Sequence, residues 1–209
     1  SGGYIDYLGY PFARGRIFNT IEKDMGQYND KKEIFWASGT AFITRKNIFE
    51  QINKFDEKLF AHMEEIDYHW KCHLNNYTIY VEPMAVIYHK GGATLKYGSY
   101  KKVYLNHRNS MILFLTNNQN LSLKNILTRI LLEKIAIIYY IITINFKAAA
   151  AAIIANFWWG FNIKYILKRR KIIQKQVKLN NSISYKLLVP YSIIKKYFLK
   201  KKKYYHEIN

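Results

Sequence analysis

The first hundred residues alternate between short polar patches and brief apolar runs. Residues 1–33 hold many Gly, Tyr and charged positions without a sustained period, which predicts loops with short elements. Residues 34–44 are apolar, β-branched and aromatic, which predicts a buried strand in which Gly39 marks a close approach of the backbone. Residues 46–52 suit a short helix.

A second helix and two short strands follow. Residues 64–75 suit a helix whose first turn is acidic, as the helix dipole favours. Residues 78–81 and 85–88 predict short strands interrupted by Pro83, before a loop at Gly91-Gly92. Strands and helices in this order predict an α/β fold.

After about residue 102 the pattern becomes helical and increasingly apolar. Apolar positions recur at helical spacing at Leu123, Ile126, Leu127, Ile130 and Leu131. Two apolar stretches follow, residues 135–146 and 148–161, separated by Lys147. Neither reaches the roughly 20 residues that span a bilayer, so an interfacial hairpin is favoured over a true span.

Charge divides the chain in the same place. The formal net charge is +19, but residues 1–100 hold equal numbers of basic and acidic residues, and residues 101–209 hold 21 Lys/Arg against two acids. Two cationic clusters occupy residues 168–171 and 200–203. We therefore expect a globular domain at residues 1–102 and a basic helical region that associates with membrane at residues 103–209.

A cationic region of this kind attracts either an anionic phospholipid surface or a nucleic acid. The long aliphatic stretches have no use on a nucleic-acid face, whereas they suit burial at the headgroup boundary, and Trp158 and Trp159 are typical interfacial anchors. We expect an anionic membrane surface as partner and no nucleic acid. The alternative is that the helices pack on the globular part and their charges are simply solvated.

The cysteine content excludes one class of protein. Cys72 is the single cysteine, so a disulfide framework is excluded. No signal peptide opens the sequence, and it begins at Ser1 in a turn-like Ser-Gly-Gly run. We expect that the native N-terminus lies upstream.

Several sequence blocks between Trp36 and Leu95 occur in a distinctive order. The blocks are Trp36-Ala-Ser-Gly-Thr-Ala-Phe-Ile-Thr-Arg45, Phe55-Asp56-Glu57, His62-Met-Glu-Glu-Ile-Asp-Tyr-His-Trp70, Asn76-Tyr-Thr-Ile79, Pro83 and Val86-Ile-Tyr-His-Lys-Gly-Gly-Ala-Thr-Leu95. Earlier and later segments also fit: Gly9 to Phe18, Asp24 to Tyr28, and Arg108-Asn109. Together they resemble the C-terminal half of the family 2 glycosyltransferases, especially bacterial rhamnosyltransferase-like enzymes.

The resemblance implies a fold and an activity. The fold would be the acceptor-side half of a GT-A type, Rossmann-like domain, followed by C-terminal amphipathic helices. The activity would be transfer of a sugar from a nucleotide-sugar donor to a glycan or lipid-linked acceptor, with inversion, in surface polysaccharide synthesis. The expected location is the cytoplasmic face of the cell membrane, with peripheral attachment.

The resemblance also implies roles for particular residues. In this family the second acid of a pair at a helix start removes the proton from the acceptor hydroxyl, and Glu65 matches it. Glu64, Asp67, Tyr68 and Trp36 would bind the acceptor. The residues alone favour a different reading, in which the acids are helix-stabilising charges and the two aromatic residues belong to the core, whereas the resemblance favours the site.

A metal and a phosphate contact are implied in the same way. His89 matches a histidine that in some members binds the divalent cation, Mg²⁺ or Mn²⁺, on the donor diphosphate. The alternative is a hydrogen-bonded histidine that closes a strand. Arg108 would pair with a phosphate, or else it is a solvated arginine.

The features of a donor site are missing from the sequence. Glu22-Lys-Asp24 and Glu65-Ile-Asp67 have acid-x-acid spacing, but neither follows an apolar strand as the family's metal-binding Asp-x-Asp does. We therefore expect that the chain by itself cannot bind a nucleotide sugar productively and is inactive. Either the chain is a fragment or a separate chain supplies the donor-binding half, which would hold the main metal ligands. The competing hypothesis is a non-enzymatic, basic module that binds membrane surfaces.

Overall fold

The computed structural model of the chain describes residues 2–89, 98–177 and 188–208. These residues form two compact units, each described separately below. The first unit draws its residues from Ser1–Phe55, Glu65–Tyr88 and Val177–Asn209, and the second from Asp56–Glu64 and His89–Gln176.

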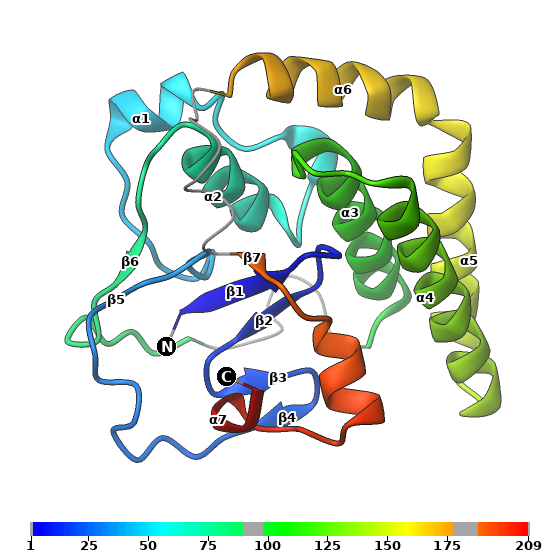
Figure 1. Cartoon of the computed structure of the whole chain (residues 1–209), viewed down its shortest axis with the longest axis horizontal. Helices are drawn as coiled ribbons and strands as arrows, with labels where there is room; N and C mark the ends of the chain where they lie inside the picture. Colours follow the sequence, from blue (N-terminus) through cyan, green and yellow to red (C-terminus); the bar gives the residue numbers. More distant parts are fainter. Residues whose placement is uncertain (1, 90–97, 178–187, 209) are drawn as a thin grey trace. The chain divides into compact units, whose positions relative to one another are not determined.

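The first unit is built on a five-stranded sheet of short strands in the order β4-β3-β2-β1-β7 (Figure 1). The strands are β1 (Gly3–Asp6), β2 (Pro11–Ala13), β3 (Arg16–Ile17), β4 (Thr20–Ile21) and β7 (Leu188–Val189). The first four pair in antiparallel fashion, and β7 pairs with β1 in parallel. The short elements expected in residues 1–33 are thus strands of one meander.

Asp6 explains why the meander and the C-terminal segment hold together. Its buried carboxylate accepts hydrogen bonds from the backbone N–H groups of Leu8 at 3.0 Å and Tyr10 at 2.8 Å, which close the turn after β1. The other oxygen accepts from the N–H of Ile193 at 3.0 Å. A buried carboxylate is stabilised by such bonds, so Asp6 joins segments far apart in the sequence.

Two apolar clusters fill this unit. The first contains Tyr4, Phe12, Ile17, Ile193, Tyr205 and Ile208, so the last short helix, α7 (Tyr205–Ile208), packs under the sheet strands. The second contains Ile52, Tyr68 and Cys72, with Phe42 and Phe49 packed against them. It joins α1 (Lys46–Gln51) to α2 (Glu64–Leu74), and both helices agree with the sequence prediction.

The strand expected at residues 34–44 is wrong. Only Trp36 pairs there, through an isolated bridge to Gly3, and residues 39–40 form a turn. Ile34 and Phe35 are nevertheless buried, so the apolar run reflects burial without a continuous ladder. The expected strand at 78–81 is shortened to β6 (Tyr80–Val81), which pairs with β5 (Lys32–Glu33).

The expected strand at residues 85–88 is also absent. These residues have an irregular backbone, and Val86, Ile87 and Tyr88 are exposed. The loop expected at Gly91-Gly92 lies outside the described residues. Strand-like composition without a pairing partner therefore misled the prediction here.

The second unit is a helical assembly. It contains η1 (Glu57–Leu59), α3 (Tyr100–Asn117), α4 (Leu123–Ile142), α5 (Phe146–Phe161) and α6 (Ile163–Lys175). The side chains of Ser99, Ser122 and Asn145 each accept a hydrogen bond from a backbone N–H in the first turn of α3, α4 and α5, respectively. These caps explain the helix starts, because they satisfy N–H groups that have no partner within the helix.

Helix α5 packs through its smallest residues. Five of them are buried alanines: Ala148, Ala149, Ala151, Ala152 and Ala155. Small side chains allow close approach of two helix backbones, and α5 lies along α3 in this unit (Figure 1). The alanine run is therefore a packing face.

Charged groups join α4 to α3. Arg129 is fully buried and donates to Glu133 at 3.1 Å and to the Ser110 hydroxyl at 2.7 Å. Glu133 also bonds the imidazole Nδ1 of His107 at 2.6 Å. The Arg129–Glu133–His107 network thus places charge on the inner face of α4.

The structure is a mixed α/β arrangement, as the sequence predicts. The division into units differs from the expected one at residues 102 and 103. Residues 188–208 belong with the first unit because β7 pairs with β1, and residues 56–64 belong with the second. In the described parts of the chain, no helix combines the length and the apolarity needed to cross a bilayer.

Candidate active site

The acid pair Glu64-Glu65 opens helix α2. Carboxylates are favoured at this end of a helix because the N-terminal N–H groups carry partial positive charge. Both side chains are half-buried, and the Oε2 atom of each is inaccessible to solvent. The pair is therefore held partly inside the protein, in contrast with an ordinary solvated helix start.

Gly39 forms the surface beside Glu65. A Cβ atom built on Gly39 would lie 3.7 Å from Cβ, Cγ and Cδ of Glu65, which is van der Waals contact. The backbone turn at residues 39–40 thus lies beside the Glu65 side chain. A side chain at position 39 would therefore fit without a clash, so the close backbone approach that the sequence predicts at Gly39 is not required there, and its neighbour is the candidate base.

Asp67 has a different environment from Glu65. It is fully buried, and its Oδ2 lies 3.0 Å from Nζ of Lys71, one turn further along α2. The same ammonium group donates to the carbonyl oxygen of Lys54 at 3.1 Å. Asp67 therefore stabilises the interior of the first unit, and this geometry gives it no direct contact with an acceptor.

Tyr68 is also an interior residue. Its ring is 1% exposed and packs against Phe42, Phe49 and Phe55, and its hydroxyl shares a hydrogen bond with Thr44 at 2.7 Å. Burial raises its pKa to about 12. The stacking role expected for Tyr68 is not supported, because no face of the ring is open.

Trp36 packs on the first strand. Its indole N–H donates to the carbonyl oxygen of Tyr4 at 2.9 Å, and a Cβ on Gly3 would lie within 2.4 Å of the indole ring. Gly3 is thus required for this packing. Trp36 remains half-buried, so one part of its ring is accessible.

The segment that leads into α2 has a strained backbone. Phe60, His62 and Met63 all have positive φ values, at 64°, 64° and 73°. Such values cost roughly 1–3 kcal/mol each for residues other than glycine, and they persist only where surrounding contacts enforce them. Strain of this kind collects at functional sites, which draws attention to the loop of residues 59–63.

Asn109 supplies the enforcing contact. Its fully buried side chain donates from Nδ2 to the carbonyl oxygens of Leu59 at 2.9 Å, Ala61 at 3.1 Å and His62 at 2.7 Å. One amide group therefore holds three carbonyl oxygens of residues 59–62, with its two hydrogens shared among them. The sequence offered Arg108-Asn109 only as a matching block, without this positioning role.

Arg108 reinforces the same loop. Its Nη2 donates to the carbonyl oxygens of Lys58 at 2.7 Å and Leu59 at 3.2 Å, and its guanidinium stacks over the rings of Tyr104 and Trp158. Protein groups engage this partly exposed side chain, and its contact with a phosphate stays a prediction. Trp158 is likewise a packing residue.

His62 was not singled out by its chemistry in the sequence, yet it lies three positions before Glu65. Burial, followed by the charge of Lys102, lowers its pKa. Its imidazole is therefore neutral at pH 7. Only its position close to the acid pair in the sequence could have identified His62 as a candidate site residue.

His89, the expected metal ligand, is exposed and belongs to the second unit, whereas Glu65 belongs to the first. Their convergence on one cleft stays a prediction. Within residues 2–89, 98–177 and 188–208, no group of three or more His, Cys, Asp and Glu side chains could hold a metal ion. A metal role of His89 stays a prediction.

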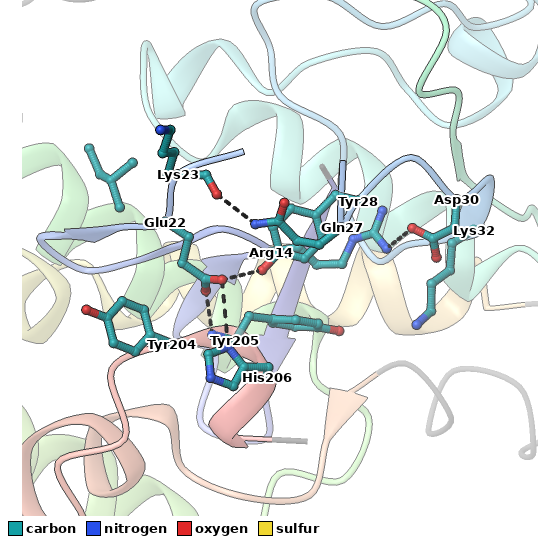
Figure 2. A pocket seen from close by; sticks show the side chains of 11 residues that line it. Arg14, Glu22, Lys23, Gln27, Tyr28, Asp30, Lys32, Tyr204, Tyr205 and His206 are labelled. Atoms are coloured by element: carbon teal, nitrogen blue, oxygen red, sulfur yellow. Dashed lines mark hydrogen bonds and ion pairs between the residues drawn. The ribbon is translucent and has the colours of Figure 1, made fainter. Parts of the chain in front are cut away.

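A pocket of about 770 Å³ lies elsewhere in the first unit, between the β3–β4 end of the sheet and α7 (Figure 2). Glu22 is central to it, accepting from the Tyr28 hydroxyl at 2.7 Å and the Tyr205 N–H at 2.6 Å, while Arg14 pairs with Asp30 at 2.6 Å. These bonds fasten α7 to the sheet. The pocket contains none of the predicted site residues, and its polar groups serve the fold.

Replacing Asn109 with alanine should loosen the strained loop. Three buried or partly buried carbonyl groups would lose a donor, at about 1–3 kcal/mol, so hydrogen exchange of residues 59–63 should accelerate roughly 10- to 100-fold. Mass-spectrometric hydrogen exchange measures this directly. Asn106→Ala, on the same helix, is the control, and equal exchange in both variants would contradict the positioning role of Asn109.

Comparison with known proteins gives a limited relationship. The chain is 28% identical over 94 residues to N-acetylglucosaminyl-diphospho-decaprenol L-rhamnosyltransferase of Mycobacterium tuberculosis, in strains CDC 1551 / Oshkosh and ATCC 25618 / H37Rv. The match covers 44% of this chain and 30% of that relative's length. No family model and no solved structure matches the chain. The chain is therefore a distant relative of a glycosyltransferase.

Proposed function

We propose that this chain is the acceptor-side part of an inverting glycosyltransferase of family 2 with a GT-A type fold. The reaction transfers a hexose or deoxyhexose from a nucleotide sugar to a glycan or lipid-linked acceptor. Glu65 is the general base. The reaction belongs to surface polysaccharide synthesis at the cytoplasmic face of the membrane.

One observation carries this proposal: the acids of α2 occupy different environments. Asp67 is fully buried beside Lys71, which fits a structural charge. Glu65 is only half-buried and lies along a glycine turn that adds no side chain of its own. Burial thus separates Asp67 from the half-buried pair Glu64-Glu65, and the resemblance to the family's acid pair selects Glu65 of these two as the base.

Glu65 has one role in the proposed reaction, which is to accept a proton. Its carboxylate removes the proton of an acceptor hydroxyl as that oxygen forms a bond to the anomeric carbon of the donor sugar. The bond from the anomeric carbon to the nucleoside diphosphate breaks on the opposite face, so the configuration inverts. The Mg²⁺ or Mn²⁺ expected for the donor has no site in the described residues, and no step here depends on it.

The relative narrows the choice of substrates to test. Its name describes L-rhamnose transfer to an N-acetylglucosaminyl-diphospho-decaprenol acceptor. For this chain we propose the same general class, a deoxyhexose donor and a lipid-linked diphosphosugar acceptor. The matched region spans 30% of the relative, so this choice is a starting point for assay.

The experiment is a transfer assay on the protein expressed from its complete coding region. A panel of nucleotide sugars, including nucleotide-activated L-rhamnose, is incubated with a prenyl-diphospho-N-acetylglucosamine acceptor. We expect a disaccharide product whose new linkage has inverted anomeric configuration by NMR. A retained configuration would exclude the single-displacement mechanism.

A second candidate function is a non-enzymatic basic module that binds membrane surfaces. The excess of basic residues after residue 101 favours it. It predicts no transfer with any donor in the panel while binding to anionic vesicles persists. Product formation in the complete protein would reject it.

A further inference from the structure

Helix α4 exposes a continuous apolar stripe along its entire length. Its members are Leu123 at 70% exposure, Leu127 at 58%, Leu131 at 59%, Ile135 at 50%, Ile138 at 55% and Ile142 at 73%. Successive members are three or four residues apart, so they share one face of the helix. Six large aliphatic side chains on one exposed face exceed the scattered apolar residues of an ordinary surface.

The opposite face of α4 carries its buried charges. Arg129 and Glu133 lie inside the second unit, bonded to each other and to α3. A surface helix of a water-soluble protein has the reverse arrangement, with apolar residues inside and charges outside. Burial of the Arg129–Glu133 pair therefore sets the rotation of α4 about its axis, so that the apolar stripe faces outward.

Helix α5 repeats this arrangement with aromatic residues. Its exposed stripe consists of Phe146 at 63%, Ile154 at 49%, Phe157 at 59% and Phe161 at 85%. Its buried face is the alanine run. The large side chains of α5 thus face outward while the small ones form the packing face, although burying phenyl rings would normally be favoured.

A groove of about 580 Å³ lies between α4 and α5, next to the α5 stripe. Ile137 from α4 and Ile153, Phe157 and Phe161 from α5 line it, and Lys134 at its edge donates to Asn156 at 3.2 Å. Phe157 and Phe161 belong to both the α5 stripe and the groove. We call the stripes and the groove together the α4–α5 apolar surface.

Charge selects the occupant of this surface. Residues 123–175 contain ten Lys/Arg and one acidic residue, Glu133, which is buried. A second copy of the chain would bring the same positive charge and would be repelled. An anionic bilayer offers both an apolar interior for the stripes and phosphate groups for the surrounding lysines.

We propose that the α4–α5 apolar surface inserts into the headgroup boundary of an anionic lipid bilayer. Phe157 and Phe161 are its principal apolar anchors. Lys134 and Lys147 are exposed at positions between the apolar residues and face the lipid phosphates. The proposal deepens the proposed function by naming the surface that would bring the protein to a lipid-linked acceptor.

The test is sedimentation of the full chain with vesicles of phosphatidylcholine alone or with added phosphatidylglycerol. We expect binding to the anionic vesicles that weakens as salt is raised. The double variant Phe157→Ser and Phe161→Ser should bind about 100-fold more weakly, the scale expected for transferring two phenyl side chains out of water. Ile43→Ser, at a fully exposed apolar position of the first unit, should bind within twofold of the original chain.

The double variant should fold normally because both phenylalanines are exposed. The circular dichroism spectrum of the double variant should match that of the original chain. Unchanged vesicle binding by the double variant overturns the proposal, as does absence of binding by the original chain. Loss of a dimer in sedimentation velocity, without vesicle binding, would assign the surface to self-association instead.

The outcome is independent of glycosyl transfer. Vesicle binding is measured without donor or acceptor, so failure of the transfer assay leaves it unaffected. Conversely, if the chain binds no vesicles, transfer to a water-soluble acceptor still tests the proposed chemistry. The two hypotheses therefore fail separately.

Discussion

Replacing Glu65 with glutamine should reduce kcat for sugar transfer by roughly 10²- to 10⁴-fold, the usual contribution of a positioned general base. The amide keeps the size of the side chain and its contact with the Gly39 turn but cannot accept the hydroxyl proton. Donor affinity should stay unchanged. Steady-state transfer kinetics and donor titration on the protein from the complete coding region measure both quantities.

Glu64→Gln is the matched control for this prediction. If the acid pair merely stabilises the start of α2, neutralising either residue should cost a similar few tenths to 1 kcal/mol of stability, and neither should act specifically on kcat. If Glu65 is the base, its variant alone loses turnover at unchanged stability. Retained turnover in Glu65→Gln would reject the assignment.

Glu65→Asp adds a graded test. The shorter side chain keeps the carboxylate but withdraws it by one methylene from the position that Glu65 reaches. We expect kcat to lie between those of the original protein and Glu65→Gln. The pH dependence of kcat should keep its acidic limb in Glu65→Asp, because a carboxylate must still be ionised to act as a base.

Replacing Arg129 with methionine should destabilise the second unit by about 3–5 kcal/mol, because it leaves the buried carboxylate of Glu133 without its main countercharge. The remaining partner, His107, contacts the other oxygen of Glu133. Urea unfolding and hydrogen exchange of α4 amides measure the loss. A cost below about 1 kcal/mol would mean that the network is not a stability determinant.

The double variant Arg129→Met with Glu133→Leu is the control for the buried charge. Two apolar side chains replace the ion pair, so no uncompensated charge remains, and much of the lost stability should return. Rescue would show that the single variant fails through a stranded carboxylate. Destabilisation equal to the sum of both single variants would instead indicate a packing defect.

The same carboxylate makes stability depend on pH. Burial raises the pKa of Glu133, but the charge of Arg129 and the hydrogen bond of His107 outweigh burial and lower it to about 2, against an ordinary value of 4.5. The stabilisation from Glu133 is therefore complete above about pH 4.5 and is lost as the pH falls toward 2. Subtracting the profile of Glu133→Gln from that of the original protein should isolate this window.

The candidate site was predictable in part. The acid pair and its place at a helix start depend on local sequence, and α2 agrees with the structure. The sequence left Tyr68 open between the core and acceptor binding, and it did not predict that Asp67 is buried. The residues of a single helix turn do not show which face of the helix will be buried. The packing of Phe42 and Lys54 against α2 decides which of its residues are enclosed.

The roles of Arg108 and Asn109 depended on tertiary structure for a similar reason. Both residues bond carbonyl oxygens about 50 positions earlier in the chain. Backbone carbonyls are the same in every sequence, so nothing in the pattern marks them as partners. The strained loop before α2 was equally invisible, because positive φ values at Phe60, His62 and Met63 oppose their intrinsic preferences.

The sequence by itself determined the helices after residue 100, the segregation of positive charge and the apolar periodicity of α4, since these follow from local spacing and composition. Tertiary structure alone decided that β7 joins β1 and that Arg129 points inward while the leucines of α4 point outward. The physical reason is that periodicity shows which residues share a helix face, whereas the partners available in space decide which face is buried.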